Sequence, residues 1–159
     1  MITAQTEQAN EIDPLLELAV FGHLDNKTEL ELILLKGHLL LETILETVLK
    51  RNDIKNLDNY SFHRKVSTLE SIDFKDKFRK EFIVSSLREI NRLRNKVAHE
   101  FIFDIANGEF EIWALKILDN LKGEKFSKYT FRTKIVHSFS VLTKNILELQ
   151  SLEYEKNYR

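Results

Sequence analysis

The chain of 159 residues contains no cysteine, one proline and four glycines. Without cysteine it has no disulfide, no thiol nucleophile and no thiolate ligand for a metal. The scarcity of glycine and proline leaves little material for tight turns, which disfavours folds built from hairpins. No run of apolar residues reaches the roughly 20 that span a bilayer as a helix. These absences favour an all-helical protein without membrane contact, and they fit a reducing cytosol.

The charge is balanced, with 24 Lys and Arg against 25 Asp and Glu and a formal net charge of -1. A dedicated nucleic-acid-binding protein is usually basic, so any contact with nucleic acid must be local. The first ten residues are polar and lack the basic start and apolar run of a targeting peptide. We therefore expect a cytoplasmic protein.

Apolar residues recur at helical spacing along most of the chain. The predicted helices cover residues 14–21, 26 or 27–51, 61–71, 76 or 80–101, and 125–155. The second is apolar nearly all round, which is typical of a central bundle helix or a dimer face, and Gly37 within it permits a close helix crossing. We expect one domain over 1–159, in which 1–26 form a short helix and lead-in and 28–150 form the bundle core.

The segment after residue 100 fits two structures. Asn107-Gly108 is the strongest short hairpin signal, and it lies between the apolar stretches 101–105 and 109–113. The same region also fits a helix capped at Asn107, because apolar residues recur there at helical spacing. These are Phe110, Trp113, Ile117, Leu118 and Leu121. We favour the helix, and thus an all-α, antiparallel bundle of about five to six helices with a short hairpin near 101–113 as the alternative.

One octet, Leu93 to Glu100, carries the clearest chemical signal, because it places Arg94 five positions before His99. At ~100° per residue, Arg94 falls in the middle of an apolar stripe on its helix. The stripe consists of Ile83, Leu87, Ile90, Val97 and Phe101. A buried lone charge is costly. Arg94 should therefore meet a carboxylate, a ligand phosphate or a polar seam between subunits.

An imidazole and a guanidinium suit the cleavage of RNA. The imidazole of His99 can accept or donate a proton near neutral pH, and Arg94 can stabilise charge on a phosphoryl group. RNA supplies its own nucleophile, the 2′-hydroxyl, so neither a metal nor another cofactor is needed. Asn95 lies one helical turn before His99 and is the natural residue to orient its ring. Arg94 and His99 themselves lie ~140° apart around the helix.

The six residues from Arg94 to His99, RNKVAH, resemble the R-x(4–6)-H signature of the HEPN superfamily. The resemblance spans roughly residues 28–150. It implies an all-helical bundle, a homodimer that joins two motifs in one cleft, and metal-independent endoribonuclease activity. Members of this superfamily often act as toxins of toxin–antitoxin or phage-defence systems, so an antitoxin is a possible partner. Carried over, Arg94 stabilises the phosphate, His99 is the general acid or base, and Asn95 supports them.

The signature occurs elsewhere in the chain as well. Arg132 and His137 have the same spacing, and Arg92 with His99 matches the six-residue variant. We favour Arg94, because Asn95 follows it and the small Ala98 leaves room beside the histidine. Arg132 lies at the edge of its own apolar stripe and His137 lies outside it, which predicts a solvated pair.

Three further cations on the motif helix, Arg88, Arg92 and Lys96, are the predicted RNA-binding residues. In the preceding long helix, His38 and Glu42 are one turn apart. They could form a pair that faces the motif or a hydrogen bond on the surface, and we favour the surface. No zinc motif and no pair of histidines at metal spacing is present, so we expect no metal site.

A second function remains open, that of a non-catalytic helical interaction or regulatory module. The chain also resembles the mannitol operon repressor group, which has similar Arg-Asn and Ala-His residues in a comparable helical frame. On this hypothesis Arg94 and His99 form a polar seam at an interface, and the near-neutral charge needs no explanation.

Overall fold

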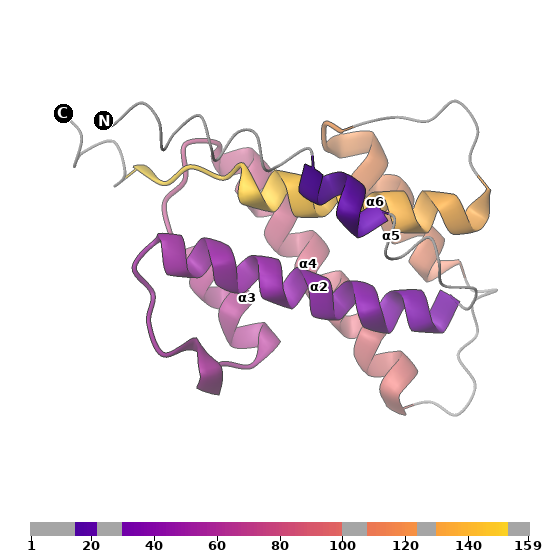
Figure 1. Cartoon of the computed structure of the whole chain (residues 1–159), viewed down its shortest axis with the longest axis horizontal. Helices are drawn as coiled ribbons and strands as arrows, with labels where there is room; N and C mark the ends of the chain where they lie inside the picture. The colour runs from indigo at the N-terminus through magenta and orange to yellow at the C-terminus, as the bar shows by residue number, and fades with distance from the viewer. Residues whose placement is uncertain (1–14, 22–29, 100–107, 124–129, 153–159) are drawn as a thin grey trace.

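The computed structural model describes residues 15–21, 30–99, 108–123 and 130–152 (Figure 1). A short helix covers 15–21, and the elements that follow are α2 (Leu30–Arg51), the 3-10 turn η1 (Leu57–Asn59), α3 (Phe62–Ser71), α4 (Lys77–His99), α5 (Glu109–Asn120) and α6 (Phe131–Leu147). Within these described ranges the only strand-like pairing is an isolated bridge between Phe74 and Ser151. The predicted all-α bundle is confirmed. None of the described helices combines the length and apolarity needed to cross a membrane.

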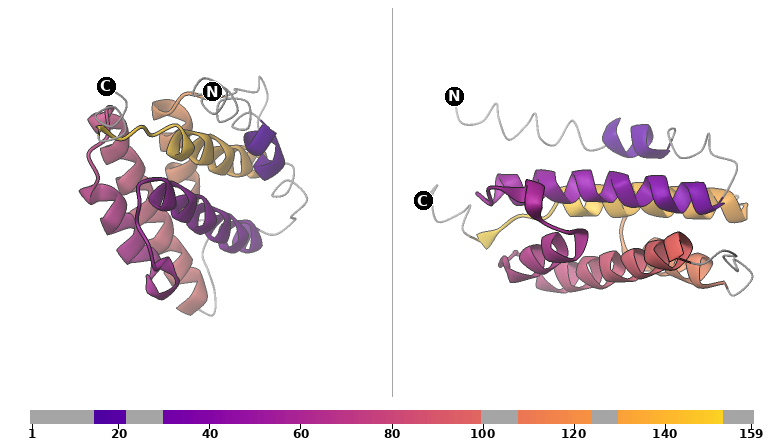
Figure 2. Two further views of the ribbon diagram at one scale, coloured as in Figure 1. Left: turned by 60° about the vertical axis from the view of Figure 1, so that its left-hand side comes forward. Right: turned by 90° about the horizontal axis from the view of Figure 1, so that it is seen from below.

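The helices pack in two layers, which Figure 2 shows from below the view of Figure 1. One layer holds α2 and α6, the other holds α3, α4 and α5, and the short helix at 15–21 covers the outer side of the first layer. Helix α4 runs antiparallel to α5, since Arg92 near its end meets Glu109 while Ser86, further back, meets Trp113. The layers enclose one apolar core.

The starts of α3 and α5 bear on two predictions from the sequence. Helix α3 begins where the predicted helix over 61–71 does, because the hydroxyl of Ser61 caps it and accepts the backbone N–H of Arg64 at 3.1 Å. The hairpin alternative is wrong, because residues 109–113 are helical and the favoured helix is confirmed there. Its N-cap is Gly108, with φ 70°, instead of Asn107. The other half of the hairpin, 101–107, lies outside the described residues.

Helix α6 is shorter than the prediction of 125–155. It begins after Thr130, whose hydroxyl caps it, and ends at Leu147. The chain then leaves the helix to pair with the segment before α4. The N–H groups of Lys75 and Leu152 each bond to a carbonyl across the bridge at 2.9 Å. This non-local pairing replaces the last helical turns that the sequence alone predicts.

A close crossing of α2 and α6 occurs at Gly37, as predicted. A Cβ atom at this position would lie 2.5 Å from ring carbons of Phe139, far inside contact distance. The Phe139 ring is fully buried, and its centroid lies 4.8 Å from that of Trp113 and 6.1 Å from that of Phe110. Only glycine allows α2 to approach this aromatic cluster so closely.

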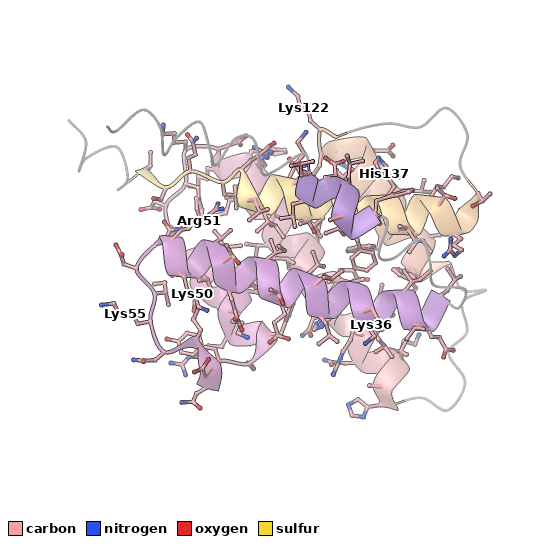
Figure 3. The ribbon with its side chains drawn as sticks, viewed as in Figure 1. Lys36, Lys50, Arg51, Lys55, Lys122 and His137 are labelled. Atoms are coloured by element: carbon pink, nitrogen blue, oxygen red, sulfur yellow. The ribbon has the colours of Figure 1, made fainter. Side chains whose placement is uncertain are left out.

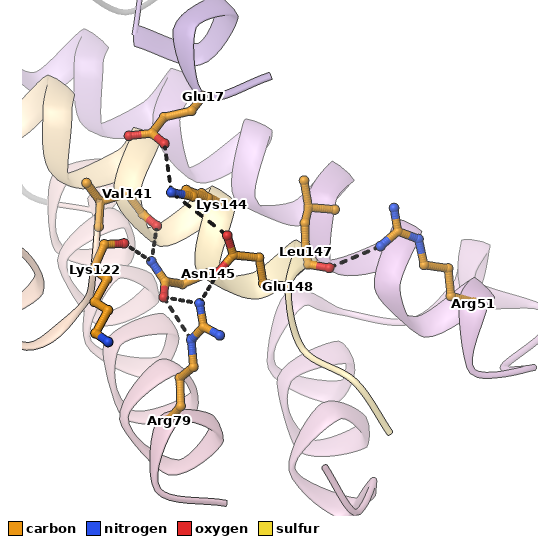
Figure 4. A network of polar contacts seen from close by, with 9 residues as sticks. All are labelled: Glu17, Arg51, Arg79, Lys122, Val141, Lys144, Asn145, Leu147 and Glu148. Atoms are coloured by element: carbon orange, nitrogen blue, oxygen red, sulfur yellow. Dashed lines mark hydrogen bonds and ion pairs between the residues drawn. The ribbon is translucent and has the colours of Figure 1, made fainter. Parts of the chain in front are cut away.

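A polar network joins the start of α4 to the end of α6 (Figure 4). The buried Asn145 donates to the backbone oxygens of Val141 at 2.8 Å and Lys122 at 2.9 Å. Its Oδ1 atom accepts from Nε of Arg79 at 2.8 Å, and the same guanidinium pairs with Glu148. Asn145 thereby ties α4, α6 and the segment that follows α5 together.

Replacing Asn145 with alanine should therefore lower the free energy of unfolding by about 2–3 kcal/mol, because the half-buried Arg79 and two backbone oxygens lose a hydrogen-bond partner. Urea unfolding measures the change. Asn120→Ala is the matched control, since Asn120 is exposed and its side chain donates to the carbonyl of Lys116 in its own helix. Equal effects in the two variants would contradict the structural role of the network.

Candidate functional site

The motif residues lie in the last turns of α4, which is a continuous helix through His99. Arg94 is half-buried, whereas His99 is exposed at the helix end. Because the helix is regular, the two side chains leave it ~140° apart. One copy of α4 therefore directs Arg94 and His99 to different sides of the helix.

Arg94 differs from the other arginines of α4 in its partner. Its Nη1 atom donates to Oδ1 of Asn95 at 3.1 Å, and no carboxylate of the described residues lies at ion-pair distance from it. Each of the other three arginines has a glutamate: Arg79 pairs with Glu148, Arg88 with Glu70, and Arg92 with Glu89 and Glu109. The sequence allows three partners for Arg94: a carboxylate, a ligand phosphate or a polar seam between subunits. In the described part of the chain, no carboxylate takes this role.

Asn95 is exposed, and its carboxamide contacts Arg94. The sequence instead predicts a contact with the His99 ring, and no such hydrogen bond occurs among the described side chains. Asn95 therefore acts on the guanidinium side of the motif. By accepting one N–H of Arg94, it restricts the rotation of a long side chain whose freedom costs up to ~2 kcal/mol to remove.

The three predicted RNA-binding cations all have carboxylate partners. Lys96 lies 3.2 Å from Glu109, which also binds Arg92 at 2.9 Å. The hydrogen bond from Arg92, and then that from Lys96, lower the pKa of the Glu109 carboxyl. A hydrogen bond from Arg88 lowers the pKa of Glu70 in the same way. RNA phosphates would therefore have to replace glutamates at these cations.

A groove of about 750 Å³ lies over α4, between the end of α3 and α5. Trp113, Ile112 and Ser86 form part of its lining. Its charged residues are four cations and four carboxylates, namely Lys80, Arg88, Arg92 and Lys116 against Glu70, Glu81, Glu89 and Glu109. This balance gives the groove no net attraction for a polyanion.

His38 is a buried polar residue at the packing surface of α2 and α4. Its Nε2 atom lies 3.0 Å from Oδ1 of Asn91, and its ring centroid lies 4.1 Å from that of Phe62. The favoured surface hydrogen bond with Glu42 is wrong, because His38 is only 4% exposed and Glu42 binds Lys65 at 2.7 Å. The nearly continuous apolar surface of α2 was the signal that a histidine within it would be buried.

The surroundings of His38 favour its neutral form. Burial lowers the pKa of the imidazole most, and the hydrogen bond with Asn91 opposes this effect. The nearby guanidinium of Arg94 lowers the pKa further, while Glu42 raises it. Its pKa remains below the ordinary value near 6.5. The ring is therefore uncharged at neutral pH, and its Nε2–H donates to Asn91.

The second match to the motif, Arg132 with His137, is not the solvated pair that the sequence predicts. His137 is only 1% exposed, and its ring meets Phe21 edge-on at 5.9 Å. It lies where the short helix at 15–21 crosses α6 (Figure 3). Helix α6 is buried continuously from 135 to 143, because layers cover it on both sides. This histidine is not accessible to a macromolecular substrate.

In the described ranges, no group of three His, Asp or Glu side chains is arranged to hold a metal ion. Comparison of the chain with protein-family models, with curated proteins and with solved structures finds no match. Membership of the HEPN superfamily therefore stays a prediction, and it rests on residues 94–99 and their helical setting.

Proposed function

We propose that the protein is a metal-independent endoribonuclease that uses Arg94 and His99. The observation that carries the proposal is the half-buried guanidinium of Arg94, which has no carboxylate partner among the described residues, although every other arginine of its helix has one. Among the described residues, its remaining N–H groups have no hydrogen-bond partner, so they could bind an anion. A guanidinium can bind a phosphate through two parallel hydrogen bonds, which fixes both position and orientation.

The proposed reaction proceeds by proton transfer and charge stabilisation. The imidazole of His99 accepts the proton of the 2′-hydroxyl, whose oxygen attacks the adjacent phosphorus, or it donates a proton to the leaving 5′-oxygen. The new O2′–P bond forms as the P–O5′ bond breaks, which yields a 2′,3′-cyclic phosphate and a 5′-hydroxyl. Arg94 stabilises the negative charge that develops on the phosphoryl oxygens. Asn95 holds Arg94 in place.

Helix geometry makes this proposal depend on a homodimer. Since Arg94 and His99 of one chain are ~140° apart on α4, the proposed site joins Arg94 of one subunit to His99 of the other. Arg92 is ~20° from His99 around the helix and is the cation best placed to contact RNA beside it. The HEPN resemblance extends the proposal to the biological role. The protein would act in the cytoplasm as a toxin or in phage defence, with an antitoxin as its partner.

An RNA-cleavage assay in excess EDTA tests the proposal. The wild-type protein should cut single-stranded RNA, and His99→Ala and Arg94→Ala should each lose activity by about 100-fold or more. His63 and Arg64 are consecutive residues of α3 and both are exposed, so they offer matched controls for the two substitutions. His63→Ala and Arg64→Ala should retain activity. Absence of cleavage by the wild-type protein, or full activity of His99→Ala, would refute the nuclease.

A second proposed function is a non-catalytic helical module, like that of the mannitol operon repressor group. The balanced charge of the groove and the glutamate partners of Arg88, Arg92 and Lys96 favour it. On this proposal Arg94 belongs to a polar seam between subunits. Arg94→Ala should then weaken dimerisation, measured by sedimentation velocity, and neither the variant nor the wild-type protein should cut RNA.

A further inference from the structure

His38 connects α2 to the part of α4 that carries the motif. Its Nε2–H group donates to Oδ1 of Asn91 at 3.0 Å, across 53 positions of sequence. Asn91 lies one helical turn before Arg94, so this bond fixes the rotation of α4 at the turn that leads into the motif. Helix α2 therefore acts directly on the helix face from which Arg94 projects.

The His38 ring has little freedom to move. It packs against Phe62 of α3 with 4.1 Å between ring centroids, and the residue is 4% exposed. A rigid donor of this kind costs little further entropy when it orders its acceptor. His38 is thus anchored by α3 and directed at α4, and it is too buried to contact a substrate itself.

We propose that His38, in its neutral form, is a positioning residue for Arg94, and that through Asn91 it holds α4 in the orientation that presents the guanidinium to a phosphate. The inference rests on the proposed nuclease function, in which Arg94 binds the phosphate that is cut. It adds to that site a residue from α2, far from the motif in sequence.

The charges around His38 explain why the neutral form is needed. Arg94 faces it from α4 and Glu42 lies on its own helix, while the contact from α3 is the uncharged ring of Phe62. A proton on His38 would place a second positive charge beside Arg94 in a poorly solvated setting. The two cations would repel each other, and the guanidinium would be driven from its position. A bound phosphate, in contrast, would offset this repulsion.

Two substitutions separate positioning from packing. His38→Leu removes the donor and keeps an apolar side chain, whereas the amide N–H of His38→Gln can still donate to Asn91 but takes up no proton. We expect kcat/KM for RNA cleavage to fall about 10- to 100-fold in His38→Leu, mainly through kcat, because the phosphate-binding group is misplaced. His38→Gln should retain most activity near pH 7. His63→Leu, at an exposed histidine of α3, is the control and should match the wild type.

The pH profile gives a readout that a purely structural role would not change. Because the pKa of His38 lies below its ordinary value, His38 gains its proton only on the acid side, and that charge would displace Arg94. On the acid side, kcat/KM of the wild type should therefore fall as His38 becomes charged. His38→Gln takes up no proton at this position, so its kcat/KM should fall less steeply on the acid side than that of the wild type.

The outcomes distinguish this inference from the function on which it rests. Wild-type activity in His38→Leu, with Arg94→Ala inactive, overturns the positioning role alone. Failure of the wild-type protein to cut RNA overturns the nuclease and the positioning role together. If His38→Leu does not fold, the pH dependence of kcat/KM in His38→Gln tests the inference. A decline at acid pH identical to that of the wild type would overturn it.

Discussion

Equal amounts of Arg94→Ala and His99→Ala protein, each inactive alone, should together cut RNA at about one quarter of the wild-type rate after their subunits are mixed. Random pairing makes half of the dimers mixed. Each mixed dimer has one site with both changes and one site with an intact Arg94 and an intact His99. The measurement is the cleavage rate in EDTA after the two proteins are unfolded and refolded together.

The control for this experiment is a mixture of Arg94→Ala with the double variant that lacks both side chains. No pairing of those subunits restores a complete site, so the mixture should stay inactive. Native mass spectrometry of differently tagged subunits establishes that mixed dimers form. Mixed dimers without recovered activity would show that Arg94 and His99 do not act across the subunits, contrary to the ~140° between them on α4.

Substitution of Gly37 by alanine should lower the free energy of unfolding by about 1–3 kcal/mol. Alanine is the better helix former by about 1 kcal/mol, but its Cβ atom would lie 2.5 Å from the Phe139 ring. That ring cannot move freely, because Trp113 and Phe110 pack against it. Urea unfolding followed by circular dichroism measures the loss.

The exposed neighbour Lys36 provides the control for helix propensity, and Lys36→Ala should change stability by less than about 0.5 kcal/mol. The double variant Gly37→Ala with Phe139→Leu tests the contact itself. Its cost should be smaller than the sum of the two single costs, because the smaller side chain relieves the clash. Additive costs, or a stabilised Gly37→Ala, would contradict the close crossing.

Local signals predicted most of the fold. The Ser61 cap depends on a hydroxyl and an N–H three residues away, so the sequence contains the whole interaction. The region after Asn107 had a stronger turn signal than helix signal at short range, but a helix buries Phe110, Trp113 and Ile117 in the core. The early end of α6 could not be predicted, because the bridge between Phe74 and Ser151 joins distant segments.

The candidate site was predictable for single residues and not for their partners. The position of Arg94 on an apolar stripe indicated partial burial, which the structure has. The contact of His38 with Asn91 spans 53 positions, and that of Lys65 with Glu42 spans 23. Such contacts depend on how helices are arranged. The exposure expected for His137 failed for the same reason, since a stripe on one helix does not reveal a second covering layer.

The central place of α6 affects the order of assembly during synthesis. Helix α6 contributes Phe139 and other fully buried side chains to the core, so the helices made earlier leave apolar surface uncovered until α6 has emerged from the ribosome. The same delay applies to Asn145, which secures the start of α4. A nascent chain therefore lacks the ordered scaffold beneath the motif until α6 has been made. If the proposed nuclease function holds, the chain cannot cut RNA at the ribosome that synthesises it before that point.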